Sequence, residues 1–202
     1  MDWAHLAAFN GVLLAALLSP GPAMLVALRT TLIEGRFAGM MLGLGLGTAA
    51  AVWTLMALMG LNAVFTVVPL AYLALKIIGA AYLIYLAVMI WRDAASPLDT
   101  ATPVARQNPF LRGLFVNLSN PKSMLFAASV LVVIFPRDLT SGNIAVIVIN
   151  HMVIEWLAYG AFALLLSTPA ARNGYLRLKP VFDRVAATVL GALGLRLMLD
   201  RT

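Results

Sequence analysis

Two short stretches place helix-breaking and polar residues inside long apolar runs. Residues 18–25 read LSPGPAML, and residues 118–125 read LSNPKSML. Proline removes a backbone donor and clashes with the preceding turn, so each stretch is expected to interrupt a helix. The freed backbone groups, together with the ammonium of Lys122 at the second break, could hold a substrate carboxylate. A plain proline kink that only aids packing is the alternative at each site.

A possible acid–base pair lies further along the chain. His151 and Glu155 are four residues apart, so they share one face of a helix. Glu155 is the carboxylate expected to lie well inside a membrane span. A lone buried carboxylate should pair with Lys76 or Lys122 or become neutral, and either behaviour suits proton coupling, with His151 assisting near neutral pH. A static ion pair that satisfies buried charge is the alternative.

The remaining candidate residues are polar or conformationally special positions near the two breaks. The candidate substrate-binding residues are Ser19, Pro20, Gly21, Pro22, Asn117, Asn120, Pro121, Lys122 and Lys76. Lys76 could instead extend to the membrane interface, as long cationic side chains often do. One His and one Glu are too few for a zinc site, and the chain has no cysteine. We therefore expect no metal and no cofactor.

The composition determines what must surround these residues. Of the 202 residues, 62% are hydrophobic and 11% are charged, against about 45–50% and about 25% in soluble domains. This chain therefore needs lipid around it. The net charge of +6 is better explained by basic cytoplasmic loops than by nucleic-acid binding, because no basic stripe or aromatic platform accompanies it.

Apolar runs long enough to cross a bilayer core of about 30 Å occur six times. The expected spans are residues 5–28, 37–61, 69–91, 113–135, 143–166 and 181–199. We expect a single all-α transmembrane domain over residues 1–202, in which a polar loop at 92–112 separates a three-helix half at 1–91 from another at 113–202. The first and fourth spans are the broken ones.

Basic residues between the spans predict the orientation. Nine lie on one side, namely Arg29, Arg36, Arg92, Arg106, Arg112, Arg172, Arg177, Lys179 and Arg184, and three on the other, namely Arg137, Arg196 and Arg201. Both termini are therefore expected outside the cytoplasm. Because each half has an odd number of spans, the second half would enter the membrane in the opposite direction and form an inverted repeat.

Small and aromatic residues within the spans have simpler interpretations. Gly39, Gly43, Gly45 and Gly47 have a spacing that permits close helix contact. The aromatic residues Trp53, Tyr82, Tyr85, Trp156 and Tyr159 could stack on a substrate, but packing or interface anchoring is the more common role.

Four stretches together resemble the LysE/RhtB family of bacterial amino-acid exporters. They are LSPGPAMLVALRTTLIEGRFAG at 18–39, LKIIGAAYLIYLAV at 75–88, GLFVNLSNPKSMLFAASV at 113–130 and GALGLRLML at 191–199. The resemblance implies a multi-pass inner-membrane protein that exports amino acids or their derivatives, by proton antiport. It also assigns the family's signature positions to Pro20, Gly21, Pro22, Gly35, Arg36, Lys76, Gly79, Tyr82, Asn117, Asn120, Pro121 and Lys122. The family usually has Asn after the first motif, where this chain has Ala23.

The expected function is therefore export of an amino acid or derivative by alternating access, without enzymatic activity. The expected partners are that small molecule, protons and the lipid bilayer, and a homodimer could be needed to seal the pathway. A cation exporter or channel is the first alternative, although it would need more carboxylates than Glu155. A membrane-embedded enzyme lacks a nucleophile constellation here. A scaffold protein would use both breaks for packing alone.

Overall fold

The described part of the chain is helical throughout. The computed structural model describes residues 2–19, 21–67, 69–96, 108–136 and 138–199, and within them not the side chains of Pro22, residues 61–76, Gly79, Pro121, Arg172 and Leu197. Eight helices form in these ranges, and no strand does. They are α1 (Trp3–Leu18), α2 (Pro22–Glu34), α3 (Arg36–Val67), α4 (Pro69–Asp93), α5 (Pro109–Leu118), α6 (Pro121–Ile134), α7 (Ser141–Leu166) and α8 (Pro169–Leu199). The predicted all-α class is confirmed.

Both predicted helix breaks are present. The pair α1 and α2 bends by 59°, and the pair α5 and α6 bends by 62°. Pro22 and Pro121 stand in the first turns of α2 and α6, where the missing proline N–H would have no intrahelical partner anyway. Each proline therefore ends one helix and begins the next instead of kinking a continuous one.

The candidate membrane spans number between two and four within the described residues. Arg36–Gly60 and α7 are each long and apolar enough to cross a membrane, and each bent pair is a further candidate. The connection expected between the fifth and sixth spans, residues 167–180, is helical from Pro169 onward, because α8 begins there and continues through Pro180. The span expected at 181–199 stays a prediction. Basic residues that looked like a loop instead extend α8 as a polar first part.

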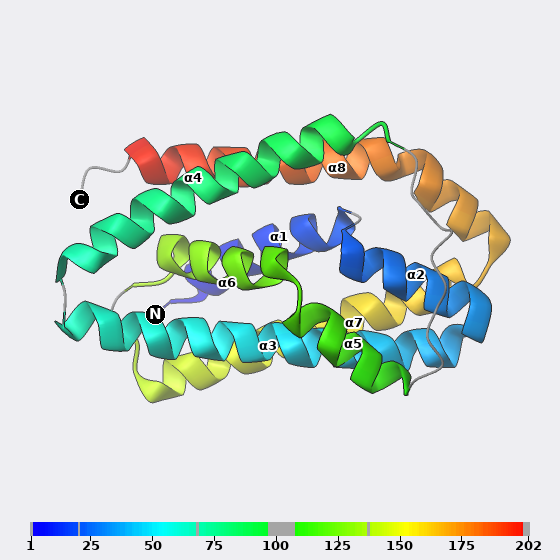
Figure 1. Cartoon of the computed structure of the whole chain (residues 1–202), viewed down its shortest axis with the longest axis horizontal. Helices are drawn as coiled ribbons and strands as arrows, with labels where there is room; N and C mark the ends of the chain where they lie inside the picture. The colour runs from blue at the N-terminus through cyan, green and yellow to red at the C-terminus, as the bar shows by residue number, and fades with distance from the viewer. Residues whose placement is uncertain (1, 20, 68, 97–107, 137, 200–202) are drawn as a thin grey trace.

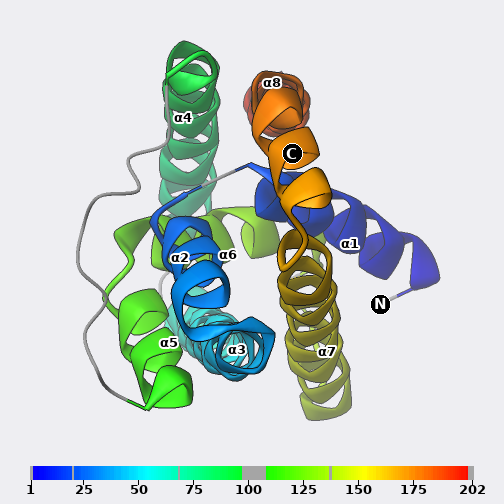
Figure 2. The same cartoon turned by 90° about the vertical axis from the view of Figure 1, so that its right-hand side faces the viewer.

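The helices lie in three layers. In Figures 1 and 2, α4 and α8 form the top layer, α1, α2 and α6 the middle layer, and α3, α5 and α7 the bottom layer. Close contacts between α4 and α8, and between α3 and both α5 and α7, hold the outer layers together. The broken helices are thus enclosed between layers, which is where interrupted backbone is tolerated in lipid.

Helices from the first part of the chain run opposite to helices from the last part. Following the chain colours in Figure 1, α1 and α2 run against α5 and α6, α3 runs against α7, and α4 runs against α8. Within the first half, Gly35 alone separates α2 from α3, and its φ of 90° lies in the left-handed region that glycine adopts readily.

The glycines of α3 lie where other helices approach most closely. A Cβ on Gly45 would lie 2.0 Å from the backbone oxygen of Phe110 in α5, and one on Gly43 would lie 2.5 Å from the Tyr159 Cβ in α7. On the facing helix α5, a Cβ on Gly113 would lie 2.1 Å from the Leu42 oxygen. The expectation that the glycine run permits close helix contact is confirmed.

Gly113→Ala is expected to destabilise the protein because the new methyl group meets backbone of α3 rather than a movable side chain. Overpacking costs about 1–3 kcal/mol, which should lower the melting temperature of the detergent-solubilised protein by about 5 °C. Gly160→Ala in α7 is the matched control, since a Cβ there meets nothing within 4 Å. Equal melting temperatures for the two variants would refute the close approach of α3 and α5.

Candidate functional site

A cavity of about 70 Å³ lies between the two helix breaks. Its lining is contributed by both broken helices, by α7 and by one residue of α3. The lining residues are Leu13, Ala16, Leu17, Ser19, Gly21, Ala23, Met24, Ala50, Asn117, Asn120, Lys122, Ser123, Phe126, His151, Glu155 and Tyr159. A single buried water occupies about 10–15 Å³ of such space, so the cavity can hold several waters or a small solute.

One end of the cavity is positively charged. The ammonium of Lys122 lies beside Gly21, where a Cβ would be 3.2 Å from Nζ. Among the residues that the structure describes, this ammonium makes no hydrogen bond or ion pair. Gly21 begins α2 without a side-chain cap, and a helix N-terminus carries a partial positive charge and unpaired N–H groups. An anion would therefore be favoured at this end.

Asn117 fixes the second break against α3. Its side-chain nitrogen donates to the Leu46 carbonyl at 2.7 Å, and its side-chain oxygen accepts from the Ser123 hydroxyl across the break. Its backbone oxygen accepts from the Trp53 indole N–H at 3.2 Å. Asn120 caps α6 by accepting from the Lys122 backbone N–H at 3.0 Å. These contacts hold Lys122 at the first turn of a new helix.

The opposite wall contains the predicted acid–base pair. His151 Nε2 lies 3.2 Å from Glu155 Oε1, and His151 Nδ1 lies 2.7 Å from the Thr54 hydroxyl. A hydroxyl both donates and accepts, so the Thr54 contact persists whether His151 is neutral or an imidazolium. Glu155 Oε2 has no hydrogen-bond partner within the described residues. The pair can thus hold a proton and still offer one oxygen to a ligand.

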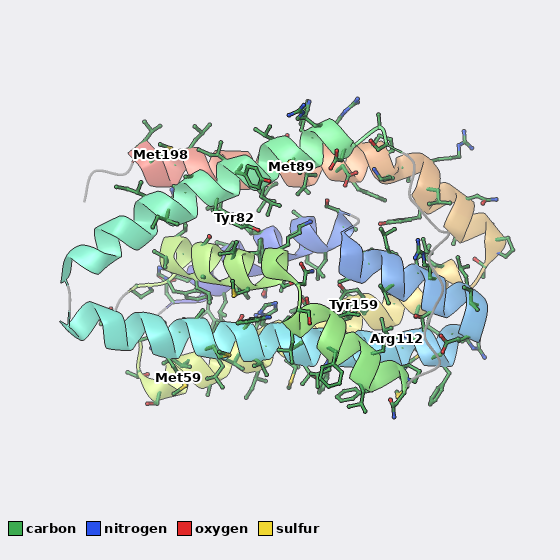
Figure 3. The ribbon with its side chains drawn as sticks, in the orientation of Figure 1. Met59, Tyr82, Met89, Arg112, Tyr159 and Met198 are labelled. Atoms are coloured by element: carbon green, nitrogen blue, oxygen red, sulfur yellow. The ribbon has the colours of Figure 1, made fainter. Side chains whose placement is uncertain are left out.

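The structure brings most of the predicted site residues together. Ser19, Gly21, Asn117, Asn120, Lys122, His151 and Glu155 all line the one cavity. Pro20 lies outside the described residues, and the side chains of Pro22, Pro121 and Lys76 are likewise not described. Tyr159 also lines the cavity, and Figure 3 shows it near the α5–α6 break, with Arg112 further along α5.

Of the outcomes expected for Glu155, pairing with Lys122 is absent from the described residues, and Glu155 contacts His151 instead, because the two side chains project from successive turns of α7. Pairing with Lys76, whose side chain is not described, and a neutral Glu155 stay predictions. Glu155 is not the only buried carboxylate among the described residues. Asp183 in α8 is 3% exposed and pairs with Lys179 at 2.9 Å. The sequence signal for the Lys179–Asp183 pair is its spacing of four residues. This signal does not stand out because the basic residues around Lys179 are equally typical of a loop.

The two broken helices are also joined outside the cavity. Arg112 of α5 donates to the Thr30 hydroxyl at 2.9 Å and pairs with Glu34 at 2.9 Å, both on α2. Asn10 of α1 and Asn150 of α7 also exchange side-chain hydrogen bonds, at 2.7 and 3.2 Å. None of the residues in these two sets of interhelical contacts lines the cavity.

The cavity combines a cation at one wall with a carboxylate oxygen at another, and otherwise has several apolar lining residues. In the described ranges, no three His, Cys, Asp or Glu side chains gather as metal ligands. A helical membrane protein whose broken helices enclose such a cavity has the architecture of a small-molecule transporter.

The family model of the LysE type translocator matches residues 14–201. The chain belongs to this family, whose members are transporters rather than enzymes.

Individual relatives match over most of their length. The threonine efflux protein of Salmonella typhimurium is 28% identical over 93% of this chain and 94% of its own. The homoserine/homoserine lactone efflux protein of the same organism is 31% identical over 76% of each chain. An uncharacterized membrane protein of Escherichia coli, YahN, is 29% identical over 94% of this chain and 87% of its own. No solved structure matches.

Proposed function

We propose that this protein exports amino acids or their derivatives from the cytoplasm, using the cavity between the helix breaks as its substrate site. The observation that carries the proposal is the presence in one cavity of the Lys122 ammonium and of Glu155 Oε2, neither of which has a direct partner among the described residues. An α-amino acid is a zwitterion that presents a carboxylate and an ammonium close together. It therefore complements both walls.

The proposed binding mode assigns a role to each wall. The substrate carboxylate lies between Lys122 and the N-terminus of α2, where charge-assisted hydrogen bonds are strong. The substrate ammonium faces Glu155. Ser19, Asn117 and Asn120 line the same cavity, and together with the backbone of the two breaks, including Pro20, Gly21, Pro22 and Pro121, they shape the space for the substrate. Lys76 remains a proposed contributor from α4.

The nature of the lining favours a small substrate with a neutral side chain. Ala23, Met24 and Phe126 add apolar surface, and Ala23 in particular supplies no side-chain donor or acceptor. The names of the threonine and homoserine efflux relatives agree with this size and charge. We accordingly take threonine and homoserine as the first substrates to test.

Export against a gradient is proposed to be driven by proton antiport. His151 and Glu155 form a buried chain from Thr54 to the cavity, and buried carboxylates and histidines commonly relay protons in membrane proteins. A proton that enters from outside neutralises Glu155, which weakens its hold on the substrate ammonium and favours release. No metal or cofactor takes part in this scheme.

The proposed setting is the bacterial inner membrane, with both termini outside the cytoplasm. The halves at 1–91 and 113–202 form an inverted repeat within one domain of residues 1–202, joined by the cytoplasmic loop at 92–112. The opposite directions of equivalent helices support this proposal. Alternating access then consists of the two halves rocking around the enclosed cavity, in one chain or in a homodimer.

The test is efflux from cells that express or lack the protein. Cells are loaded with radiolabelled threonine, homoserine or lysine, and the label that leaves is followed over time. The proposal expects faster efflux of the neutral amino acids in the expressing strain, with lysine affected less. Identical efflux from both strains for the whole panel of amino acids would refute it.

A further inference from the structure

A buried chain of polar contacts connects the first helix break to the end of α4. The Ser19 hydroxyl donates to Asp183 Oδ1 at 2.8 Å, and Lys179 Nζ lies 2.9 Å from Asp183 Oδ2. Lys179 Nζ also donates to the backbone oxygens of Asp93 at 2.8 Å and Ala94 at 3.1 Å. All three side chains are less than 10% exposed. This chain lies outside the roles assigned above to Lys122 and Glu155.

The two lysines near Asp183 differ in how their charges are satisfied. An ammonium has three N–H donors, and Lys179 uses them on Asp183 and two carbonyls, so its bonding is complete. Lys122 has no direct partner among the described residues, and it lines the same cavity as Ser19, whose hydroxyl donates to Asp183. Asp183 is thus bound to one lysine and reaches, through Ser19, the cavity that the other lysine lines.

Tyr175 and Ser19 are the other groups to consider near this carboxylate. Burial raises the pKa of the Tyr175 hydroxyl, and the charge of Asp183 adds to the effect, so Tyr175 remains neutral. Ser19 is neutral and is the C-cap residue of α1, directly before the break. The Asp183 carboxylate on α8 therefore lies next to this break.

A substrate carboxylate beside Lys122 would bring a second negative charge toward Asp183. Like charges in a poorly solvated site repel each other, and both would compete for the same ammonium. We propose that Asp183 is a positioning residue that competes with the substrate carboxylate for Lys122, and that Lys179 limits this competition by holding Asp183 on α8. This inference rests on the proposed carboxylate site at Lys122.

Competition of this kind helps a transporter, because a substrate must leave as readily as it enters. With the cavity empty, Asp183 balances the buried charge of Lys122. With substrate bound, the ammonium is shared, and Asp183 favours return to the empty state. Asp183 also accepts the hydrogen bond from Ser19 at the break. A substrate carboxylate that enters the cavity therefore acts on the contact between α1 and α8.

The test compares two substitutions with opposite expected signs. Asp183→Asn keeps one acceptor oxygen for Lys179 and offers its NH2 group to the Ser19 hydroxyl oxygen, but it removes the competing charge, so the KM for homoserine efflux should fall about fivefold and kcat should fall with it. Lys179→Met releases Asp183 toward Lys122, so KM should rise by a similar factor. Both are measured in proteoliposomes and normalised to folded protein, which keeps the result valid if either variant is less abundant.

Homoserine lactone provides the internal control, since its carboxylate is esterified and cannot compete for Lys122. Its KM should change less than twofold in both variants. Glu34→Gln is the matched carboxylate control, because Glu34 pairs with Arg112 and does not line the cavity. Unchanged KM in Asp183→Asn, or shifts of the same sign in both variants, would overturn the inference.

The background variant Lys122→Met separates failure of this inference from failure of the proposed site. If Lys122→Met raises the homoserine KM and abolishes the effect of Asp183→Asn, the inference is supported. If Lys122→Met raises KM while Asp183→Asn has no effect in either background, only the inference fails. If Lys122→Met leaves KM unchanged, the carboxylate site itself is wrong and the inference falls with it.

Discussion

Lys122→Met should nearly abolish amino-acid efflux while leaving the protein folded. Removing one partner of a buried charge pair costs about 2–5 kcal/mol of binding, which corresponds to a loss of roughly 30-fold or more in kcat/KM. Because the ammonium has no direct partner in the described structure, methionine should fill its place without leaving another charge unpaired. Efflux of radiolabelled threonine from proteoliposomes measures the loss.

Stability gives this prediction its control. Burying a charge that has no direct partner is costly, and Lys122 has none among the described residues, so the melting temperature of Lys122→Met should equal or exceed that of the wild type. The Lys122→Met variant should therefore lose transport activity while it keeps its stability. Wild-type efflux kinetics in Lys122→Met would contradict the assigned role, whereas loss of folded protein would contradict the description of Lys122 as unpartnered.

Glu155→Gln should uncouple transport from the proton gradient. Glutamine can keep the hydrogen bond to His151 at Oε1, but it cannot bind and release a proton. In proteoliposomes loaded with threonine, an acidic exterior should accelerate efflux by the wild type, and this acceleration should fall at least tenfold in Glu155→Gln. Exchange of labelled for unlabelled threonine, which needs no net proton movement, should be retained in part.

Glu34→Gln is the matched control for this experiment as well. It neutralises a carboxylate that pairs with Arg112 at 2.9 Å and does not line the cavity. Its response to the pH gradient should equal that of the wild type. If Glu155→Gln also responded fully to the gradient, Glu155 would be a static partner of His151, and proton coupling would have to occur elsewhere.

Local sequence was sufficient to locate the breaks and the polar residues of the site. A proline in a helix has only a few tolerated positions, so the two motifs around Pro22 and Pro121 predicted the two bent pairs. The pairing of His151 with Glu155 followed from a spacing of four residues. The close helix contacts at Gly43 and Gly47 followed in the same way from small-residue spacing, whereas the contact at Gly45 with α5 did not.

The partners of buried charges could not be predicted, because they come from segments far apart in the chain. Asp183 accepts from Ser19, which lies 164 residues away, and nothing in either segment alone indicates the other. The extension of α8 to Pro169 was also missed, since basic residues near a span suggest a loop as readily as a helix. Only the packing of α8 against α1 and α4 makes Lys179 buried rather than exposed.

The sequence by itself thus determined that the chain is helical, membrane-embedded and twice interrupted, because these properties depend on composition and on the local chemistry of proline. The tertiary structure decided that both interruptions face one cavity, that Lys122 lies beside Gly21 with no direct partner among the described residues, and that Asp183 contacts the first break through Ser19. Those facts depend on which helices meet. In this chain the glycine spacing predicted that helices would pack closely, but only the packing of the layers decided which helix faces each glycine.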